Sequence, residues 1–309
     1  MKRWRIRLFC TLLSTLLLAA CGHGVPAQQA LTTAGLQAAV ELELAAAPAA
    51  TPAPQVTAAP ESAPREQPVY DPLRLPEYAE AFLGDALSDY CAVIMAIEAG
   101  ETSVQLSGKS DFARIERVIH ALYAPKMLLY DAKFFEGTGP FSYADDTGCL
   151  TIRYLYGRET HLALIGAYAQ RINQALAQCR PGAAPEAWAE SLYLWVVEHL
   201  RYELDMRLTV YDAVTTGIAY CQTYAGLYQL LLTQAGIPCY LVGGSVDVDG
   251  DGVADGEHEW NRLWLDGAWV YADPTWDRGD LSFYAMTYDE CVRSGHLEPY
   301  LDPCDALLN

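Results

Sequence analysis

The stretch HEWNRLWLDGAWVYAD, residues 258–273, decides the fold of this chain. Two strand-like runs, Glu259 to Leu265 and Ala268 to Asp273, flank the dipeptide Asp266-Gly267. An Asp-Gly pair between two strand-like runs is a strong signal for a two-residue β-hairpin turn. The turn also fixes the register, because the residues on either side of it must pair first and the others follow in step. The sequence therefore predicts an antiparallel hairpin.

This register relates His258 to Asp273. Continuing the ladder places Trp260 opposite Asp273 and His258 opposite Thr275. Residues 273 and 275 share one face of their strand, so Asp273 becomes the diagonal neighbour of His258, with Cβ atoms roughly 7 Å apart. A carboxylate at that distance can orient an imidazole and stabilise its charged form. The alternative is a purely structural pair, a histidine at a strand end and an aspartate that starts a turn before Pro274.

Cys221 stands at the start of an expected helix. Five apolar residues fall on one helical face, and Gly236 followed by Pro238 is a stop signal; the five are Tyr224, Leu227, Tyr228, Leu231 and Leu232. Thr215, Thr216 and Gly217 break structure upstream, which leaves Cys221 in the first turn. The unpaired N–H groups and the positive dipole end there favour a thiolate, the reactive form of cysteine. The alternative is a buried structural cysteine.

Several blocks in series resemble the transglutaminase-like superfamily, over residues 191–278. They are Tyr220-Cys221-Gln222-Thr223-Tyr224-Ala225, Ala235-Gly236-Ile237-Pro238-Cys239, His258-Glu259-Trp260-Asn261, Leu265-Asp266-Gly267-Ala268-Trp269 and Asp273-Pro274-Thr275-Trp276-Asp277. The resemblance implies Cys221 as nucleophile, His258 as general base and acid, and Asp273 as the residue that orients His258. It also suggests Tyr202 and Gln222 as candidates for stabilising an oxyanion. Ala219 departs from the pattern, since many family members carry glycine there.

The expected fold class is α+β. The resemblance implies a papain- and transglutaminase-like core, in which the helix with Cys221 packs on an antiparallel sheet that carries His258 and Asp273. We place this domain at residues 181–309. A region of mixed helices and strands, residues 77–180, precedes it and shows no catalytic motif.

The amino terminus is typical of an exported lipoprotein. A basic head and a short apolar run make residues 1–20 a signal peptide, too short for a comfortable membrane span. Leu18-Ala19-Ala20-Cys21 resembles the bacterial lipoprotein processing box, which implies cleavage before Cys21 and lipidation of its thiol. The alternative is an ordinary signal peptide with a nearby cysteine. Residues 21–76, rich in Ala and Pro, read as a tether, so we expect a membrane-anchored protein that faces outside the cytoplasm.

The charge of the chain bears on its partners. Removing the four basic residues of the signal peptide takes the formal net charge from −19 to −23. Nucleic acid binding needs Lys and Arg to neutralise phosphates, so an acidic surface argues against nucleic acid. The expected substrate is a protein or peptide, with cell-wall peptide as one candidate.

An acidic loop precedes His258. Asp247, Asp249, Asp251 and Asp255 match the first ligand positions of a calcium loop, with glycine at the sixth position. The last position should be Glu but is His258, so the bidentate ligand is missing. Calcium is thus a candidate ligand, and no cofactor is required by the proposed chemistry; the alternative is a solvated acidic turn between two strands.

Together these features predict a membrane-anchored thiol enzyme that acts on amide or peptide bonds by acyl transfer. The acyl-enzyme would pass to water, as in a peptidase or deamidase, or to an amine, as in protein cross-linking. Hydrolysis is favoured, because water needs no second substrate site. The alternatives are a non-catalytic surface-binding module that keeps the fold, and a calcium-stabilised adhesion protein.

Overall fold

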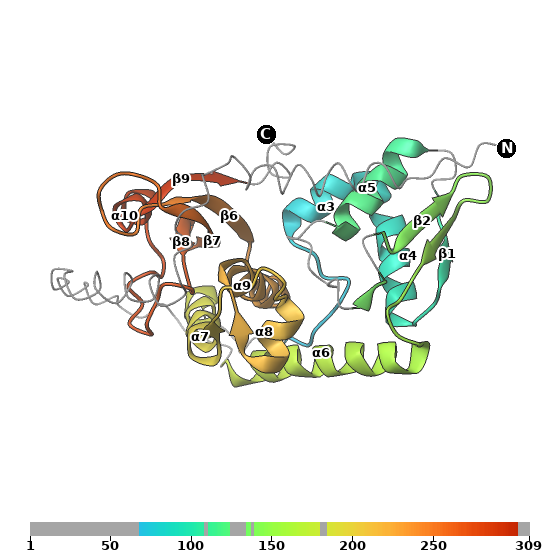
Figure 1. Cartoon of the computed structure of the whole chain (residues 1–309), viewed down its shortest axis with the longest axis horizontal. Coiled ribbons are helices and arrows are strands. Elements are labelled where there is room, and N and C mark those ends of the chain that lie inside the picture. Colours follow the sequence, from blue (N-terminus) through green and yellow to red (C-terminus); the bar gives the residue numbers. More distant parts are fainter. Residues whose placement is uncertain (1–67, 108–110, 124–133, 137–138, 180–183, 302–309) are drawn as a thin grey trace, which may run out of the picture. The chain divides into compact units, whose positions relative to one another are not determined.

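The computed structural model describes residues 68–107, 111–123, 134–136, 139–179 and 184–301, and the side chains up to residue 297 (Figure 1). The chain forms two compact units. The described part of the first lies within residues 83–165, and that of the second comprises residues 68–82 and 166–301. The signal peptide, Cys21 and most of the predicted tether lie outside the described residues. Among the described helices, none has the length and apolar character needed to cross a membrane.

The first unit combines short helices with a small sheet. Its helices are the 3-10 turn η1 (Gly84–Ala86), α4 (Leu87–Glu98) and α5 (Phe112–Tyr123), and its strands are β1 (Ser103–Gln105), β2 (Phe141–Ala144) and β3 (Cys149–Ile152). The sheet is antiparallel in the order β1-β3-β2. A buried Asp89 holds the unit together: Arg114 Nε donates to its Oδ2 at 2.6 Å and the backbone N–H of Ser107 to its Oδ1 at 2.7 Å. Residues 77–180 were expected to be a mixture of helices and strands, and the described part of this unit has both.

Two helices belong partly to each unit, α3 (Glu77–Leu83) and α6 (Arg158–Gln178). The helices of the second unit are α7 (Pro185–His199), α8 (Val210–Thr216), α9 (Cys221–Ala235) and α10 (Tyr288–Arg293). Its strands are β4 (Arg201–Tyr202), β5 (Ile218–Ala219), β6 (Cys239–Val246), β7 (Gly256–Leu265), β8 (Ala268–Ala272) and β9 (His296–Leu301). The last four form one antiparallel sheet in the order β8-β7-β6-β9, and α9 packs on it (Figure 1). The predicted α+β architecture, with the Cys221 helix against an antiparallel sheet, is confirmed.

The predicted hairpin forms with the predicted register. Leu265 pairs with Ala268 and Trp264 with Trp269, and the ladder ends at Asn261 and Ala272, one step before the expected pairing of Trp260 with Asp273. Gly267 takes a positive φ of 78°, as a two-residue turn of this kind requires. This register decides the orientation of His258, because a slip by one residue would turn its side chain to the other face of the sheet.

Helix α9 differs from the expectation of one apolar face. Every residue from Thr223 to Ala235 is buried, polar ones included. The polar side chains are satisfied inside the unit: Gln229 Nε2 donates to Tyr78 Oη at 2.8 Å, and Gln234 Oε1 accepts the backbone N–H of Asp71 at 2.8 Å. Buried polar groups with such partners cost little. The helix is therefore the centre of the unit rather than a cover on one side of it.

The segment just before α3 packs on the second unit. Tyr70 and Leu75 are buried, and the backbone N–H of Tyr70 donates to Asn173 Oδ1 at 2.7 Å. Residues 70–75 were expected to belong to a tether that reaches residue 76, but they are part of the folded unit. The ordering comes from side-chain amides of α6 and α9 that bind the backbone, which composition alone does not reveal.

Candidate active site

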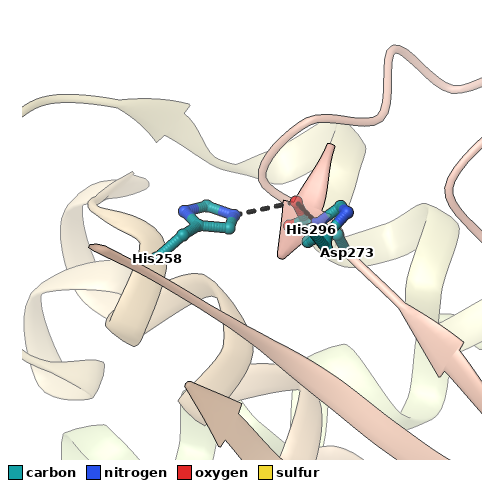
Figure 2. A group of neighbouring side chains, drawn as sticks. All are labelled: His258, Asp273 and His296. Atoms are coloured by element: carbon teal, nitrogen blue, oxygen red, sulfur yellow. Dashed lines mark hydrogen bonds and ion pairs between the residues drawn. The ribbon is translucent and has the colours of Figure 1, made fainter. Parts of the chain in front are cut away.

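His258 and Asp273 meet on the sheet as the register predicted. His258 is the third residue of β7, and Asp273 follows the last residue of β8. His258 Nε2 lies 2.8 Å from Asp273 Oδ2, and the two side chains are 7% and 0% exposed (Figure 2). An ionised carboxylate only accepts hydrogen bonds, so the imidazole carries a proton on Nε2 and donates it.

Cys221 is the first residue of α9, and it lies close enough to His258 to raise the pKa of the imidazole. With Nε2 directed to Asp273, Nδ1 is the imidazole nitrogen left for the thiol. The helix begins here because Tyr220 is extended and its backbone N–H is taken by Thr223 Oγ1 at 2.8 Å. The structure thus brings together the three residues that the sequence analysis selected.

Asn261 joins the helix to the strand. It lies three residues after His258 on β7 and is fully buried. Its Nδ2 donates to the carbonyl oxygen of Ala225, one turn into α9, at 3.0 Å. This direct hydrogen bond between β7 and α9 fixes the position of Cys221 along the sheet relative to His258. The block His258-Glu259-Trp260-Asn261 thus carries both an imidazole and the residue that positions the cysteine helix.

The electrostatics of the cluster favour a charged imidazole. Burial lowers the pKa of His258, but the charge and hydrogen bond of Asp273, together with Cys221, outweigh burial and raise it to about 10. Burial raises the pKa of Asp273, while the charges and hydrogen bonds of His258 and His296 hold it well below its usual range. Asp273 is therefore ionised throughout the neutral range and can stabilise an imidazolium beside Cys221.

The Asp273 carboxylate has two further donors. Its Oδ1 accepts the backbone N–H of Thr275 at 2.8 Å. Its Oδ2 accepts, besides His258, the Nε2 of a second buried histidine, His296, at 3.1 Å (Figure 2). His258, Asp273 and His296 each offer a ligand atom within 4.8 Å of the others, a spacing open to a metal ion. Two direct hydrogen bonds onto one carboxylate oxygen already account for this arrangement.

A tyrosine holds the backbone of Asp273 and also binds a buried aspartate. Tyr193 on α7 donates to the carbonyl oxygen of Asp273 at 2.9 Å and lies 2.9 Å from Asp277 Oδ2. Asp277 is buried and its Oδ1 accepts the backbone N–H of Gly279 at 2.7 Å. Neither residue, nor His296, was expected in the site from the sequence. Asp277 lies in the same family-like block as Asp273, but its contacts form only because the following loop folds back onto its carboxylate.

The comparison with protein families agrees with this geometry. Residues 172–274 match the family model described as the transglutaminase-like superfamily. This part of the chain is a transglutaminase-like domain. The match begins within α6 and ends one residue after Asp273, so it covers Cys221, His258 and Asp273. The predicted boundary at residue 181 stays a prediction.

Individual proteins resemble the transglutaminase-like domain over a limited stretch. Kyphoscoliosis peptidase of Mus musculus and that of Homo sapiens are each 27% identical to the chain over 103 residues, which is 29% of this chain and 15% of theirs. The chain thus matches only a small part of the length of these relatives. A solved structure described as a TGase is 17% identical, covers 39% of this chain and 34% of its own, and gives a TM-score of 0.30.

The two oxyanion candidates of the transglutaminase-like domain occupy different positions. Tyr202 on β4 pairs with Ala219 on β5, two residues before Cys221. Burial, followed by the charges of Cys221 and Asp273, raises its pKa to about 12, so the phenol keeps its proton at neutral pH. The amide of Gln222 instead donates to Glu259 Oε1 at 2.9 Å. Tyr202 therefore remains a candidate donor, whereas the amide of Gln222 is already bound to a carboxylate.

The acidic loop lies between β6 and β7. Carboxylate oxygens of Asp247, Asp249 and Asp255 lie within 4.8 Å of one another, but Asp251 is not part of this group among the described residues. The carboxylates also bind the turn itself: Asp247 Oδ1 accepts the N–H of Gly250 and Asp255 Oδ2 that of Val248. Three of the four predicted ligands are thus gathered, and calcium binding stays a prediction.

Proposed function

We propose that this protein is a cysteine enzyme that cleaves amide or peptide bonds by thiol acyl transfer, with Cys221 as nucleophile. The observation that carries the proposal is the buried hydrogen bond between Nε2 of His258 and Asp273, which leaves Nδ1 of the imidazole for the nearby Cys221. A chain that only bound a ligand would have no physical need for a thiol, an imidazole and an ionised carboxylate in series.

The reaction follows from the roles of the three groups. Cys221 Sγ, as thiolate, forms a bond to the carbonyl carbon, and the electron pair of the C=O bond moves to oxygen. The imidazolium of His258 gives its Nδ1 proton to the leaving nitrogen as the C–N bond breaks, which leaves a thioester on Cys221. Water then attacks the thioester while His258 takes its proton, and the acid leaves with the thiolate restored. Asp273 keeps Nε2 protonated throughout and stabilises the positive ring.

Two donors suit the oxyanion that forms in the first step. The backbone N–H of Cys221 lies at the start of α9, where N–H groups have no partner within the helix. The phenol of Tyr202 lies on the strand beside Ala219, close enough to Cys221 for the charge of the thiolate to act on it. We propose that these two groups bind the oxyanion together.

Hydrolysis is the outcome we favour over transfer to an amine. Water needs no dedicated acceptor site, whereas an amine acceptor does. To test both, the soluble protein is incubated with a peptide library, with and without a tagged primary amine, and the products are read by mass spectrometry. Cleaved or deamidated peptides support hydrolysis, tagged peptides support transfer, and both must disappear in Cys221→Ser. Turnover that persists in Cys221→Ser would contradict the proposal.

We also propose that the protein is exported and lipid-anchored through Cys21. The signal-like residues 1–20 and the processing box before Cys21 support this. Cells that express the full chain are fed an alkyne fatty acid, and the protein is examined for label. Label on the wild-type chain and none on Cys21→Ala is expected; equal label on both would contradict the anchor.

A further inference from the structure

His296 lies outside the segment that matches the family and has no role in the function proposed so far. It is the first residue of β9, pairs with Val246 on β6 and is fully buried. Its imidazole packs against the rings of Trp260 and Trp276, each with a centroid separation of 4.6 Å. An aliphatic or aromatic residue would fill this apolar site as well, so packing alone does not explain an imidazole here.

Both ring nitrogens of His296 have partners. Nε2 lies 3.1 Å from Asp273 Oδ2, and Nδ1 lies 3.0 Å from Ser294 Oγ. Because the ionised carboxylate only accepts, His296 carries a proton on Nε2 and donates it. Asp273 Oδ2 thus accepts from two imidazoles, and Oδ1 accepts from Thr275.

The chain enters β9 in a conformation that only glycine accepts. Gly295 has a φ of 95°, and a Cβ there would lie 2.4 Å from the carbonyl oxygen of Asp247. The same two residues are joined by a hydrogen bond of 2.8 Å from Asp247 N to Gly295 O. This close approach fixes where β9 begins, and with it the place of His296 beside Asp273.

We propose that His296 is a positioning residue of the thiol site, which holds the Asp273 carboxylate in line with His258. This inference rests on the function proposed above. Three N–H groups from β7, from β9 and from the turn after Asp273 surround the carboxylate, so it cannot rotate without losing one of them. Asp273 then presents Oδ2 to His258 in a fixed direction, and the imidazolium that results stabilises a thiolate at Cys221.

The other titratable groups around Asp273 stay neutral in the range of interest. Burial, before any charge, raises the pKa values of Tyr193, Tyr202, Tyr224 and Cys291, all of which feel the charge of Asp273, to about 12 or above. Changes between pH 5 and pH 9 therefore do not come from these four groups.

The test is the rate at which iodoacetamide alkylates Cys221, followed from pH 5 to pH 9 in four proteins. They are the wild type, His296→Leu, His296→Gln and His161→Leu. Glutamine keeps an N–H donor near the position of Nε2, whereas leucine fills the space without one. His161 is a matched control, since it is a fully buried histidine of the first unit that binds a backbone oxygen, that of Ile97, at 2.9 Å.

In His296→Leu we expect the alkylation rate at pH 6 to fall about ten- to a hundredfold, the usual effect of losing a hydrogen bond to a charged group. His296→Gln should stay within about threefold of the wild type, and His161→Leu should match it, since neither loses a donor to Asp273. If His296 had a purely structural role, glutamine at this position would not restore the alkylation rate. The leucine variant would then also leave the acid limb of the pH profile in place.

Superimposable profiles for wild type and His296→Leu, faster labelling of the leucine variant, or a glutamine variant as slow as the leucine one would each overturn the proposal. Should His296→Leu not fold, ¹⁵N-histidine NMR of the wild type and Asp273→Asn decides. A protected His296 Nε2–H signal that shifts in the variant supports the contact, and its absence in the wild type refutes it. If His258→Ala has the same Cys221 alkylation profile as the wild type, the proposed function itself is wrong.

Discussion

The charge of His258 should make the stability of the fold depend on pH. The pKa of His258 is 6.5 in an unperturbed chain and about 10 in the folded protein. A raised pKa means that the protonated ring stabilises the folded state, fully so below pH 6.5. This contribution is lost as pH rises from 6.5 through about 10.

The size of the effect follows from the same two values. At about 1.4 kcal/mol per pKa unit, the interval from 6.5 to about 10 corresponds to about 5 kcal/mol of folding free energy. His258 is only 7% exposed, so solvent screening takes little away. Against a total stability of about 5–15 kcal/mol for a domain, the effect is large enough to measure.

The assay is urea unfolding followed by tryptophan fluorescence at several values from pH 6 to pH 10, on the wild type and on His258→Gln. The free energy difference between the two proteins isolates His258 from the groups that are the same in both. It should shrink by several kcal/mol, up to about 5, as pH rises across this range. A difference that stays constant with pH, or a His258 that titrates near 6.5 by NMR, would refute the electrostatic account of the site.

Three further predictions concern separate parts of the second unit. Replacing Asn261 by Leu removes the hydrogen bond between β7 and α9. The free energy of unfolding in urea should fall by about 1–3 kcal/mol, and alkylation of Cys221 at pH 6 should slow. A variant with wild-type alkylation would show that this bond does not position the cysteine. Tyr202→Phe should reduce turnover of a cleaved peptide by about a hundredfold and leave the alkylation profile unchanged, and an unchanged turnover would remove Tyr202 from the oxyanion site. If the acidic loop binds calcium, the metal should raise the melting temperature of wild type and of Asp251→Asn but not of Asp249→Asn, and addition of a chelator should reverse the shift; identical melting curves with and without calcium would rule the ion out.

Local signals in the sequence were enough to predict the element on which each of the three central residues lies and the pairing of His258 with Asp273, but not the proximity of Cys221. Asp266-Gly267 fixed a hairpin register to one residue, and this register alone placed Asp273 diagonal to His258. The position of Cys221 followed from a glycine before the helix and a Gly-x-Pro stop after it, although Thr215 and Thr216 proved to lie within α8 rather than to break structure. Signals of this kind work because each depends on backbone geometry within a few residues.

The remaining parts of the site depend on contacts that no local pattern specifies. His296 reaches Asp273 only because β9 joins the far edge of β6, a pairing between segments about 50 residues apart. Tyr193 lies 80 residues before Asp273, the partner that it binds through a backbone oxygen. The sequence suggests the amide of Gln222 as an oxyanion donor, but in the fold this amide donates to Glu259 on β7. The surroundings of each of these side chains are set by tertiary pairing.

The central claim is that Cys221, His258 and Asp273 act as one chemical unit. The most direct test is iodoacetamide labelling of the soluble domain between pH 5 and pH 9, with the labelled cysteine identified by peptide mass spectrometry, in wild type and His258→Ala. The account predicts fast labelling of Cys221 near pH 6 in the wild type and its loss in the variant, as expected for a thiolate paired with an imidazolium. Slow labelling that follows the profile of an ordinary thiol, and is the same in both proteins, would contradict it.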